Sequence, residues 1–367
     1  MKRTELATRL LTCARATPAL LLLAAAMALT PTTARGGNDT LYIGDGGTDT
    51  VIRFDAVTGQ LRDGGNPIGI YKAPNSGGLF GPRALLIDSG KLLIANQNVD
   101  QPKNGEVLRY RLRDGLFEKA LVPAADVDSP YAPRGMVSWR GVIYVADFTG
   151  NSNGGNDLEL PGRLLAFDEK KGTFRGEFVP PPGFAHSFHP RGLVIGPNDL
   201  LYVSSVPAFP LGGDVLVFDP KTLDFVGAFV TDAGGAGQLN RPEGLVFGPE
   251  GNLYITSFRN DAADTDSIRI YDGGTGVFTG KIDLYAAGTP RAFAQALLFG
   301  PGGKLYVPIT GNDPTTTGQV RRYDVASKQF EVFVAAGTLL ASPYYLTFEK
   351  TNAGTLTYGG HGGDDRR

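Results

Sequence analysis

Cysteine is nearly absent from this sequence, because Cys13 is the only one in 367 residues. It lies within residues 1–34, which we predict to be a cleaved signal peptide. The mature chain would then have no cysteine. Such a chain can enter an oxidising compartment but gains nothing from disulfide bonds or thiolate chemistry.

The signal peptide is predicted from three features of the N-terminus. Lys2 and Arg3 begin a basic segment, and an apolar run follows at 18–29 that is too short to span a bilayer as a helix. Small residues near Ala34 suit signal peptidase. We therefore predict a periplasmic or secreted protein with no membrane attachment after cleavage.

Histidine and positive charge are also scarce. The chain has three histidines and a formal net charge of −2, which removal of residues 1–34, with four basic residues and one acidic residue, shifts to −5. No basic block follows, so we expect no nucleic-acid partner. No phosphate-cradling glycine motif is present.

Glycine is abundant, with 51 residues, about twice its ordinary frequency, and it punctuates an internal repeat. Each repeat has a first apolar run, a glycine-containing turn, a second run, a polar loop, a third run and a weaker fourth run. The first run occurs at 82–87, 133–139, 190–195, 242–247, 294–299 and 343–348. The second occurs at 41–45, 92–96, 143–147, 201–205, 253–257 and 305–309, and the third at 51–55, 107–111, 164–168, 215–219, 268–272 and 320–324.

Six copies of four short strands, spaced by about 52 residues, predict an all-β fold. The predicted architecture is a six-bladed β-propeller of four-stranded antiparallel blades over residues 35–350. The chain begins with a second run and ends with a first run, so the N- and C-terminal strands should complete one blade and close the ring. Residues 355–360 compete with 41–45 for one place in that blade. We expect residues 351–367 to form a partly disordered tail.

The loops between the runs are unequal in length. First-to-second and third-to-fourth turns are short, whereas second-to-third loops are long and polar, at 97–106, 148–163, 206–214, 258–266 and 310–318. The long loops should share one face, here called the long-loop face, with the connections between blades. Length concentrated on one face is typical of a binding face, although insertions tolerated at solvent would look the same.

The second residue of each first run should lie at the mouth of the central channel on the long-loop face. Around the ring this position holds Arg83, Arg134, Arg191, Glu243, Gln295 and Tyr344. Guanidinium groups suit carboxylate and phosphate, and three of them would repel one another without countercharge. We predict that these six residues form a ligand-binding site for an anion. The alternative is a buried ion-pair ring that holds the blades together.

A family resemblance follows from the stretch RPEGLVFGPEGNLYITSFRND at 241–261 and IRIYD at 268–272. It resembles the NHL repeats of six-bladed propellers. The repeats over 39–350 also resemble those of the related gluconolactonase/senescence-marker-protein superfamily and of the streptogramin B lyases. The resemblance implies the propeller fold, but propellers host many activities.

The resemblance to the gluconolactonases implies a divalent cation in the channel, held by Glu, Asn and Asp side chains at the ring position. Only Glu243 matches here, and three arginines work against a cation. Calcium or magnesium is therefore a cofactor that the sequence does not favour. The streptogramin lyases and the amidating-enzyme lyases imply histidine ligands. The available histidines are His186 and His189, just before Arg191, and His361 in the tail.

Three other groups of polar residues are candidate sites. His186 and His189 are candidates for proton transfer or metal binding, against the simpler interpretation as polar surface. Two clusters with calcium-binding oxygens lack the EF-hand spacing and are better interpreted as solvated turns. They are Asn96, Asn98 and Asp100, and Asp147, Asn151, Asn153 and Asn156. The aspartates that end several third runs are predicted to initiate turns.

Two functional hypotheses remain from the sequence. The first is an exported binding module for an anionic small molecule or acidic group at the channel mouth, or for a protein partner on the long-loop face. The second is a diverged metal-dependent hydrolase or lyase in which Glu243 is a metal ligand or base.

Overall fold

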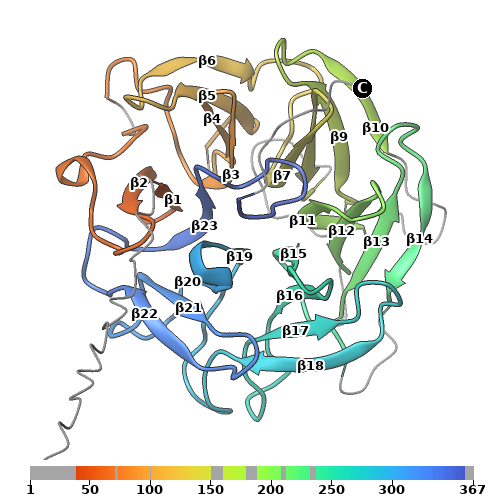
Figure 1. Cartoon of the computed structure of the whole chain (residues 1–367). Helices are drawn as coiled ribbons and strands as arrows, with labels where there is room; N and C mark the ends of the chain where they lie inside the picture. Colours follow the sequence, from red (N-terminus) through yellow and green to blue (C-terminus); the bar gives the residue numbers. More distant parts are fainter. Residues whose placement is uncertain are drawn as a thin grey trace, which may run out of the picture. The chain divides into compact units, whose positions relative to one another are not determined.

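The computed structural model describes residues 39–70, 73–99, 101–149, 160–178, 188–207, 212–231 and 237–359. The predicted signal peptide, His186 and His361 lie outside the described residues. Within them no helix has the length and apolarity needed to cross a bilayer. The chain forms six antiparallel sheets arranged as the blades of a propeller (Figure 1). The predicted all-β, six-bladed fold is confirmed.

Five blades have four strands in sequence order. Blade 2 contains β3 (Pro82–Asp88), β4 (Lys91–Asn96), β5 (Glu106–Arg111) and β6 (Phe117–Val122). Blade 3 contains β7 (Pro133–Trp139), β8 (Val142–Asp147), β9 (Arg163–Asp168) and β10 (Phe174–Phe178). Blade 4 contains β11 (His189–Ile195), β12 (Leu201–Val206), β13 (Asp214–Phe218) and β14 (Phe225–Val230).

Blades 5 and 6 have shorter inner strands than the repeats predict. Blade 5 contains β15 (Leu245–Phe247), β16 (Leu253–Ser257), β17 (Ser267–Tyr271) and β18 (Phe278–Asp283). Blade 6 contains β19 (Leu298–Phe299), β20 (Leu305–Ile309), β21 (Gln319–Tyr323) and β22 (Phe330–Val334). The only described helical segments are single 3₁₀ turns, η1 (Asp63–Gly65) and η2 (Pro301–Gly303).

Blade 1 closes the ring with both ends of the chain. Its order is β2 (Thr50–Asp55), β1 (Thr40–Asp45) and β23 (Pro343–Phe348), and β1 pairs with β23 from Leu41–Phe348 onward. Figure 1 shows the red β1 beside the blue β23. Residues 41–45, and not 355–360, therefore form the strand that pairs with β23 in this blade. The weak fourth strand expected here is reduced to isolated bridges at Leu61 and Ile68.

Aromatic residues pack neighbouring blades together. In three successive blades, a tyrosine of the second strand meets a phenylalanine that ends the first strand of the next blade. The pairs are Tyr202–Phe247, Tyr254–Phe299 and Tyr306–Phe348, with ring centroids 5.0, 5.3 and 4.9 Å apart. Edge-to-face pairs of this kind add specific geometry to apolar burial. The repeated Leu-Tyr of the second run therefore encodes contacts between blades.

The aspartates that end third strands initiate turns, as predicted. The Asp272 carboxylate accepts the backbone N–H groups of Gly274 and Thr275, and Asp168 does the same for Lys170 and Lys171. Because a side-chain acceptor replaces a backbone one, each turn closes in few residues. These turns make the second face, here called the short-turn face, compact.

Residues beyond β23 form a hairpin that reaches over the ring centre, here called the plug (351–358). A bridge joins Thr351 to Tyr358. The plug carbonyls of Ala353 and Gly354 accept the N–H groups of Ser138 on β7 and Ile195 on β11, at 2.9 and 3.0 Å. Figure 1 shows this blue segment turning from β23 toward β7. The plug thus ties the C-terminal part of the chain to the opposite blades.

Candidate anion-binding cup at the channel mouth

The six ring residues lie where the inner strand of each blade departs from regular pairing. In blade 2 the pairing register shifts between Pro82 and Leu85, and blades 3 and 4 have a shift at the equivalent position. In blade 1 the register shifts next to Pro343. A β-bulge breaks the alternation of side chains and can aim consecutive residues toward the same side. Arg83 and its equivalents thereby reach the channel mouth, with the next two residues facing the channel below them.

The structure brings the predicted ring together around one cavity of 390 Å³, here called the cup. Its lining includes all six predicted residues and five others. The described lining residues are Arg83, Arg134, Phe148, Arg191, Arg241, Glu243, Phe258, Phe293, Gln295, Thr310 and Tyr344. Phe148, Phe258 and Thr310 come from the long loops, so the cup opens on the long-loop face.

One ion pair in the cup is almost fully buried. Arg191 Nη1 donates to Glu243 Oε1 at 2.7 Å, and the two side chains are 4% and 3% exposed. The Arg191 guanidinium also lies 3.8 Å from the ring centroid of Phe148. Glu243 Oε2, which is buried, has no hydrogen-bond partner among the described residues. Glu243 therefore pairs with the charge of Arg191 through Oε1, and its Oε2 remains available to accept a hydrogen bond.

Arg83 has polar but uncharged partners. Its Nε donates to Gln97 Oε1 at 2.6 Å, and its Nη1 donates to Gln295 Oε1 at 2.9 Å. Its guanidinium stacks 4.0 Å from the ring centroid of Tyr344. These contacts fix the plane of the guanidinium without neutralising its charge. Gln295 and Tyr344, two of the predicted ring residues, are thus positioning partners of Arg83.

Burial disfavours the charged form of all three ring arginines. It lowers the pKa of Arg83, and it lowers the pKa of Arg134 and Arg191 to about 10. Arg134 and Arg191 remain charged at neutral pH. Among the described residues lining the cup there are four guanidinium groups, with Arg241, and one carboxylate. Charged groups removed from water cost several kcal/mol each unless compensated, which favours an anion in this cavity.

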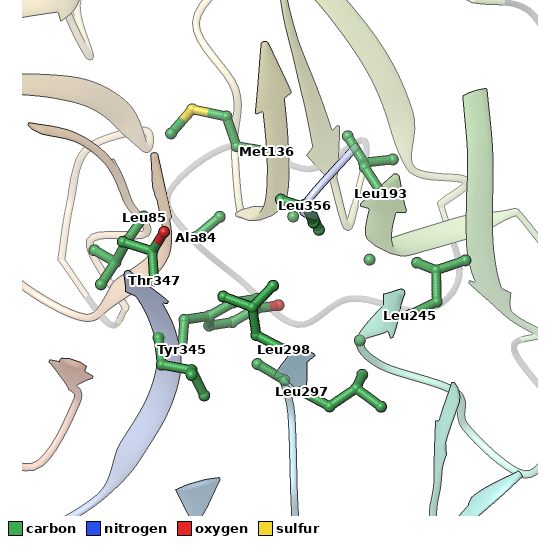
Figure 2. Close-up of a pocket in the computed structure, with 15 residues that line it drawn as sticks. Ala84, Leu85, Met136, Leu193, Leu245, Leu297, Leu298, Tyr345, Thr347 and Leu356 are labelled. Atoms are coloured by element: carbon green, nitrogen blue, oxygen red, sulfur yellow. The ribbon is translucent and has the colours of Figure 1, made fainter. Parts of the chain in front are cut away.

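Below the arginine layer the channel becomes narrow and apolar. Its next layer is made of small residues in five blades, Ala84, Gly135, Gly192, Gly244 and Ala296. A Cβ on Gly135 would lie 2.3 Å from the Arg191 carbonyl oxygen, so the inner strands approach too closely for a larger residue. Leucines and Met136 follow, and Leu356 of the plug projects among them (Figure 2). The remaining space is 50 Å³.

Tyr345 is the exception in the layer of small residues. Figure 2 shows it projecting into the channel, and it is 7% exposed. Burial and the nearby carboxylate of Glu243 raise the pKa of Tyr345 to about 12, against the opposing effect of the ring arginines. Its hydroxyl has no hydrogen-bond partner among the described residues. Tyr345 therefore provides a neutral hydroxyl beneath the arginines.

Two interpretations of polar loop residues are wrong. His189 is not polar surface, because it is fully buried and its Nδ1 lies 3.0 Å from the Phe148 carbonyl oxygen. It also does not line the cup. It packs against the Phe148 ring at 5.3 Å, so its place is behind that residue.

The second error concerns Asn96, Asn98 and Asp147, which are fully buried rather than solvated. Asn96 Oδ1 accepts the Phe80 N–H at 2.7 Å, and Asp147 accepts the N–H groups of Tyr131 and Ala132. These side chains fasten the connection between blades to the end of the second strand, since buried backbone donors need acceptors. Asp100, Asn151, Asn153 and Asn156 lie outside the described residues.

Metal coordination finds little support in the described residues. They contain no group of three or more His, Cys, Asp or Glu side chains placed to hold a metal ion. In the cup, Glu243 is the single carboxylate among the described lining residues and is paired with Arg191. The donor set that a hard cation requires is therefore not assembled there.

Sequence reasoning missed Tyr345 in the layer below the cup and five cup residues, which are Phe148, Arg241, Phe258, Phe293 and Thr310. Tyr345 had a visible signal, because PYYLTF places tyrosine where the other first runs have glycine or alanine. Arg241 and Phe293 both stand two residues before a ring position, so a repeat alignment that extended one residue upstream would have found them. Phe148 and Phe258 lie directly after second strands, in loops whose lengths differ.

Comparisons with known protein families and with curated proteins find no match. Among solved structures, the chain resembles hydrazine synthase from Kuenenia stuttgartiensis at 15% identity and a TM-score of 0.53, covering 78% of this chain and 73% of that one. A protein described as a gluconolactonase matches at 15% identity and a TM-score of 0.45 over 74% and 86% of the two chains. The Dos1 propeller matches at 16% and 0.45 over 83% and 70%. At 15% identity the first resemblance shows the fold alone.

Proposed function

We propose that this protein is an exported NHL-type propeller that binds a small anionic molecule in the cup. The observation that carries the proposal is the burial of three arginines around one cavity, at 5%, 5% and 3% exposure, with one carboxylate among the described lining residues. An anion there would offset the desolvation of the guanidinium groups and accept hydrogen bonds from their fixed forks. The predicted signal peptide and the NHL-like repeat support export and the family type.

The cup has the properties of a small-molecule site. Its volume of 390 Å³ falls within the range of about 300–1,000 Å³ that is common for ligand pockets. Partners hold Arg83 and Arg191 before any ligand arrives, which reduces the entropy lost on binding. The plug and the apolar layer close the lower end, so ligand access is from the long-loop face.

A hydrolase or lyase is the second candidate, and one observation favours it. Glu243 Oε2 and the Tyr345 hydroxyl both lack hydrogen-bond partners among the described residues and belong to adjacent layers of the channel. They offer a base and a neutral proton donor in a buried place. This candidate predicts turnover of a bound anion and, in its metal-dependent form, a divalent cation that stabilises the protein.

The proposal is tested by thermal unfolding with phosphate, small carboxylates and sugar acids, and with calcium, magnesium and zinc in the presence and absence of a chelator. We expect stabilisation by anions, of about 2.7 kcal/mol at one hundred times the dissociation constant. Stabilisation by a divalent cation that a chelator reverses would favour the metalloenzyme instead. Unchanged unfolding in every condition would contradict the anion site.

An arginine substitution localises the effect. We expect Arg83→Met to weaken the binding of phosphate about tenfold or more, because a charge-assisted hydrogen bond to phosphate is worth about 1.5–3 kcal/mol. Arg321→Met is the matched control. Arg321 is 3% exposed and its Nε also donates to a glutamine, Gln319, but it lies outside the cup. It should lower stability and leave phosphate affinity unchanged, as measured by calorimetric titration.

A further inference from the structure

Two cup residues have a backbone conformation that ordinary side chains avoid. Arg241 and Phe293 have φ angles of +46° and +47°. They occupy equivalent positions, two residues before Glu243 and Gln295. In blade 2 the same position is Gly81, with φ of +69°. In blades 3, 4 and 1 the equivalent residues are Ala132, His189 and Ser342, and none of them has a positive φ. Blades 5 and 6 thus place large side chains on a left-handed backbone that carries glycine in blade 2.

The left-handed conformation costs about 1–2 kcal/mol for a residue other than glycine, so it persists only where its surroundings impose it. Asp266 imposes it at Phe293. Its Oδ2 accepts the N–H groups of Ala292 and Phe293 at 2.8 and 3.0 Å, and it also pairs with Arg291. Arg241 is held by its own N–H, which donates to the Gly212 carbonyl at 2.9 Å. Strain that the chain retains in a cavity points to a function of the side chain.

The strained residues divide the cup into two parts of different chemistry. Arg83, Arg134 and Arg191 come from blades 2, 3 and 4 and are buried. Phe258 and Phe293 come from blades 5 and 6 and are half-exposed, with their rings edge to face at 5.6 Å. Arg241 also lines the cavity; it is exposed, and its guanidinium lies 5.8 Å from the Phe258 ring centroid. One side of the cavity is therefore cationic, and the other presents aromatic surface.

We infer that the ligand is an organic anion whose charged group is bonded to a flat apolar group such as an aromatic ring. This inference rests on the proposed function of the same cup. The charged group contacts Arg83, Arg134 and Arg191, and the apolar group packs against the Phe258–Phe293 pair. Arg241 closes over the ligand from the solvent side. A bare inorganic anion would leave the phenylalanine rings in contact with water. It would also make no apolar contact with the Phe293 ring, which the strained backbone places in the cavity.

The test compares phenyl phosphate with inorganic phosphate by calorimetric titration of the full chain. We expect phenyl phosphate to bind at least about tenfold more tightly, since the added ring buries apolar surface against the two phenylalanines. Phe293→Gly removes the aromatic side chain at a position whose backbone suits glycine. It should reduce the affinity for phenyl phosphate about threefold to tenfold, as for the loss of an aromatic pair, and leave that for phosphate within about twofold.

Two further variants keep this test decisive. Phe258→Ala removes the other ring without changing a strained position, and we expect the same loss for phenyl phosphate alone. Lys328→Gly is the control for backbone change, because Lys328 has φ of +60° in a hairpin turn outside the cup. It should bind both compounds as the unaltered protein does.

The outcomes separate the two proposals. If phosphate and phenyl phosphate bind equally, and Phe293→Gly affects neither or both alike, the inference about the apolar group is overturned while the anion site stands. If neither compound binds, the anion site itself is overturned, and the inference falls with it.

Discussion

The long-loop face and the short-turn face of the propeller are built by the same strands, yet their ends of the central channel differ in charge and in closure. At the long-loop face, three arginines and Glu243 surround an open cup of 390 Å³. Toward the other end, the channel narrows to leucines and Met136 around 50 Å³, and Leu356 of the plug lies among them. Three consecutive residues in each inner strand or just before it supply this gradient, from the ring position to the leucine layer.

This difference separates binding from stability within one repeat. The small layer of glycine and alanine and the leucines below it let the inner strands approach, which is a packing requirement. The ring position has no such requirement, since its side chains face a cavity and differ between blades. Changes in the cup should therefore alter anion binding, and changes toward the short-turn face should alter stability alone.

The largest expected effect comes from Glu243→Ala. The substitution leaves Arg191 buried without its carboxylate, which should lower the free energy of unfolding by about 3 kcal/mol or more. Phosphate should then stabilise the variant more than the unaltered protein, because the anion replaces the missing charge. Urea unfolding with and without phosphate measures both effects. A variant that phosphate stabilises less would show that Glu243 takes part in binding the anion itself.

A smaller effect is expected from Leu356→Ala in the plug. Half-buried apolar surface is lost from the lower end of the channel, which should cost about 1–2 kcal/mol. Phosphate affinity should stay within about twofold, since the cup lies above the apolar layer. Leu339→Ala, at a leucine that is 46% exposed, is the control and should change stability little. A large loss of affinity in Leu356→Ala would mean that the two ends are coupled.

The smallest effect concerns Asp168 in a turn on the short-turn face. A hydrogen bond from Arg175 and the N–H groups of Lys171 and Lys170 lower the pKa of Asp168 to about 2. A carboxyl with a depressed folded-state pKa stabilises the protein above its unfolded pKa, and this contribution is lost as pH falls through the folded pKa. Asp168→Asn should therefore be slightly less stable than the unaltered protein above about pH 4.

The difference between Asp168→Asn and the unaltered protein should shrink as pH falls toward about 2, in urea unfolding followed over that range. A constant difference over the whole range would show that the turn does not depend on the charge of Asp168. Phosphate affinity near pH 7 should be the same in both proteins, because the turn lies on the short-turn face.

The sequence was sufficient for the repeat, the ring closure and the six ring positions, because these depend on periodicity. The alternation of apolar runs marks the strands, and the start at a second run predicts the pairing of β1 with β23. The turns at Asp168 and Asp272 were equally predictable, since a short polar side chain before a glycine-rich turn has one common role. These features occur in several blades, so the pattern can be recognised even where a single blade departs from it.

The remaining features of the cup are exceptions to the repeat. Phe293 enters the cavity because its φ is positive, and no residue pattern indicates positive φ for phenylalanine. Phe148 and Phe258 depend on loops of different length. The burial of His189 and Asp147 depends on connections between blades that the repeat does not describe. In four of the six inner strands a register shift beside the ring position decides which of two adjacent side chains faces the channel, and it was not visible in the apolar pattern.

The central claim is that the cup binds an organic anion with its charged group on the arginines. Crystals soaked with 4-iodophenyl phosphate test it most directly, because iodine scatters anomalously and marks one end of the compound. The account predicts phosphate density against Arg83, Arg134 and Arg191 and an iodine peak beside Phe258 and Phe293. Ordered compound elsewhere on the protein, or a reversed orientation in the cup, would contradict it.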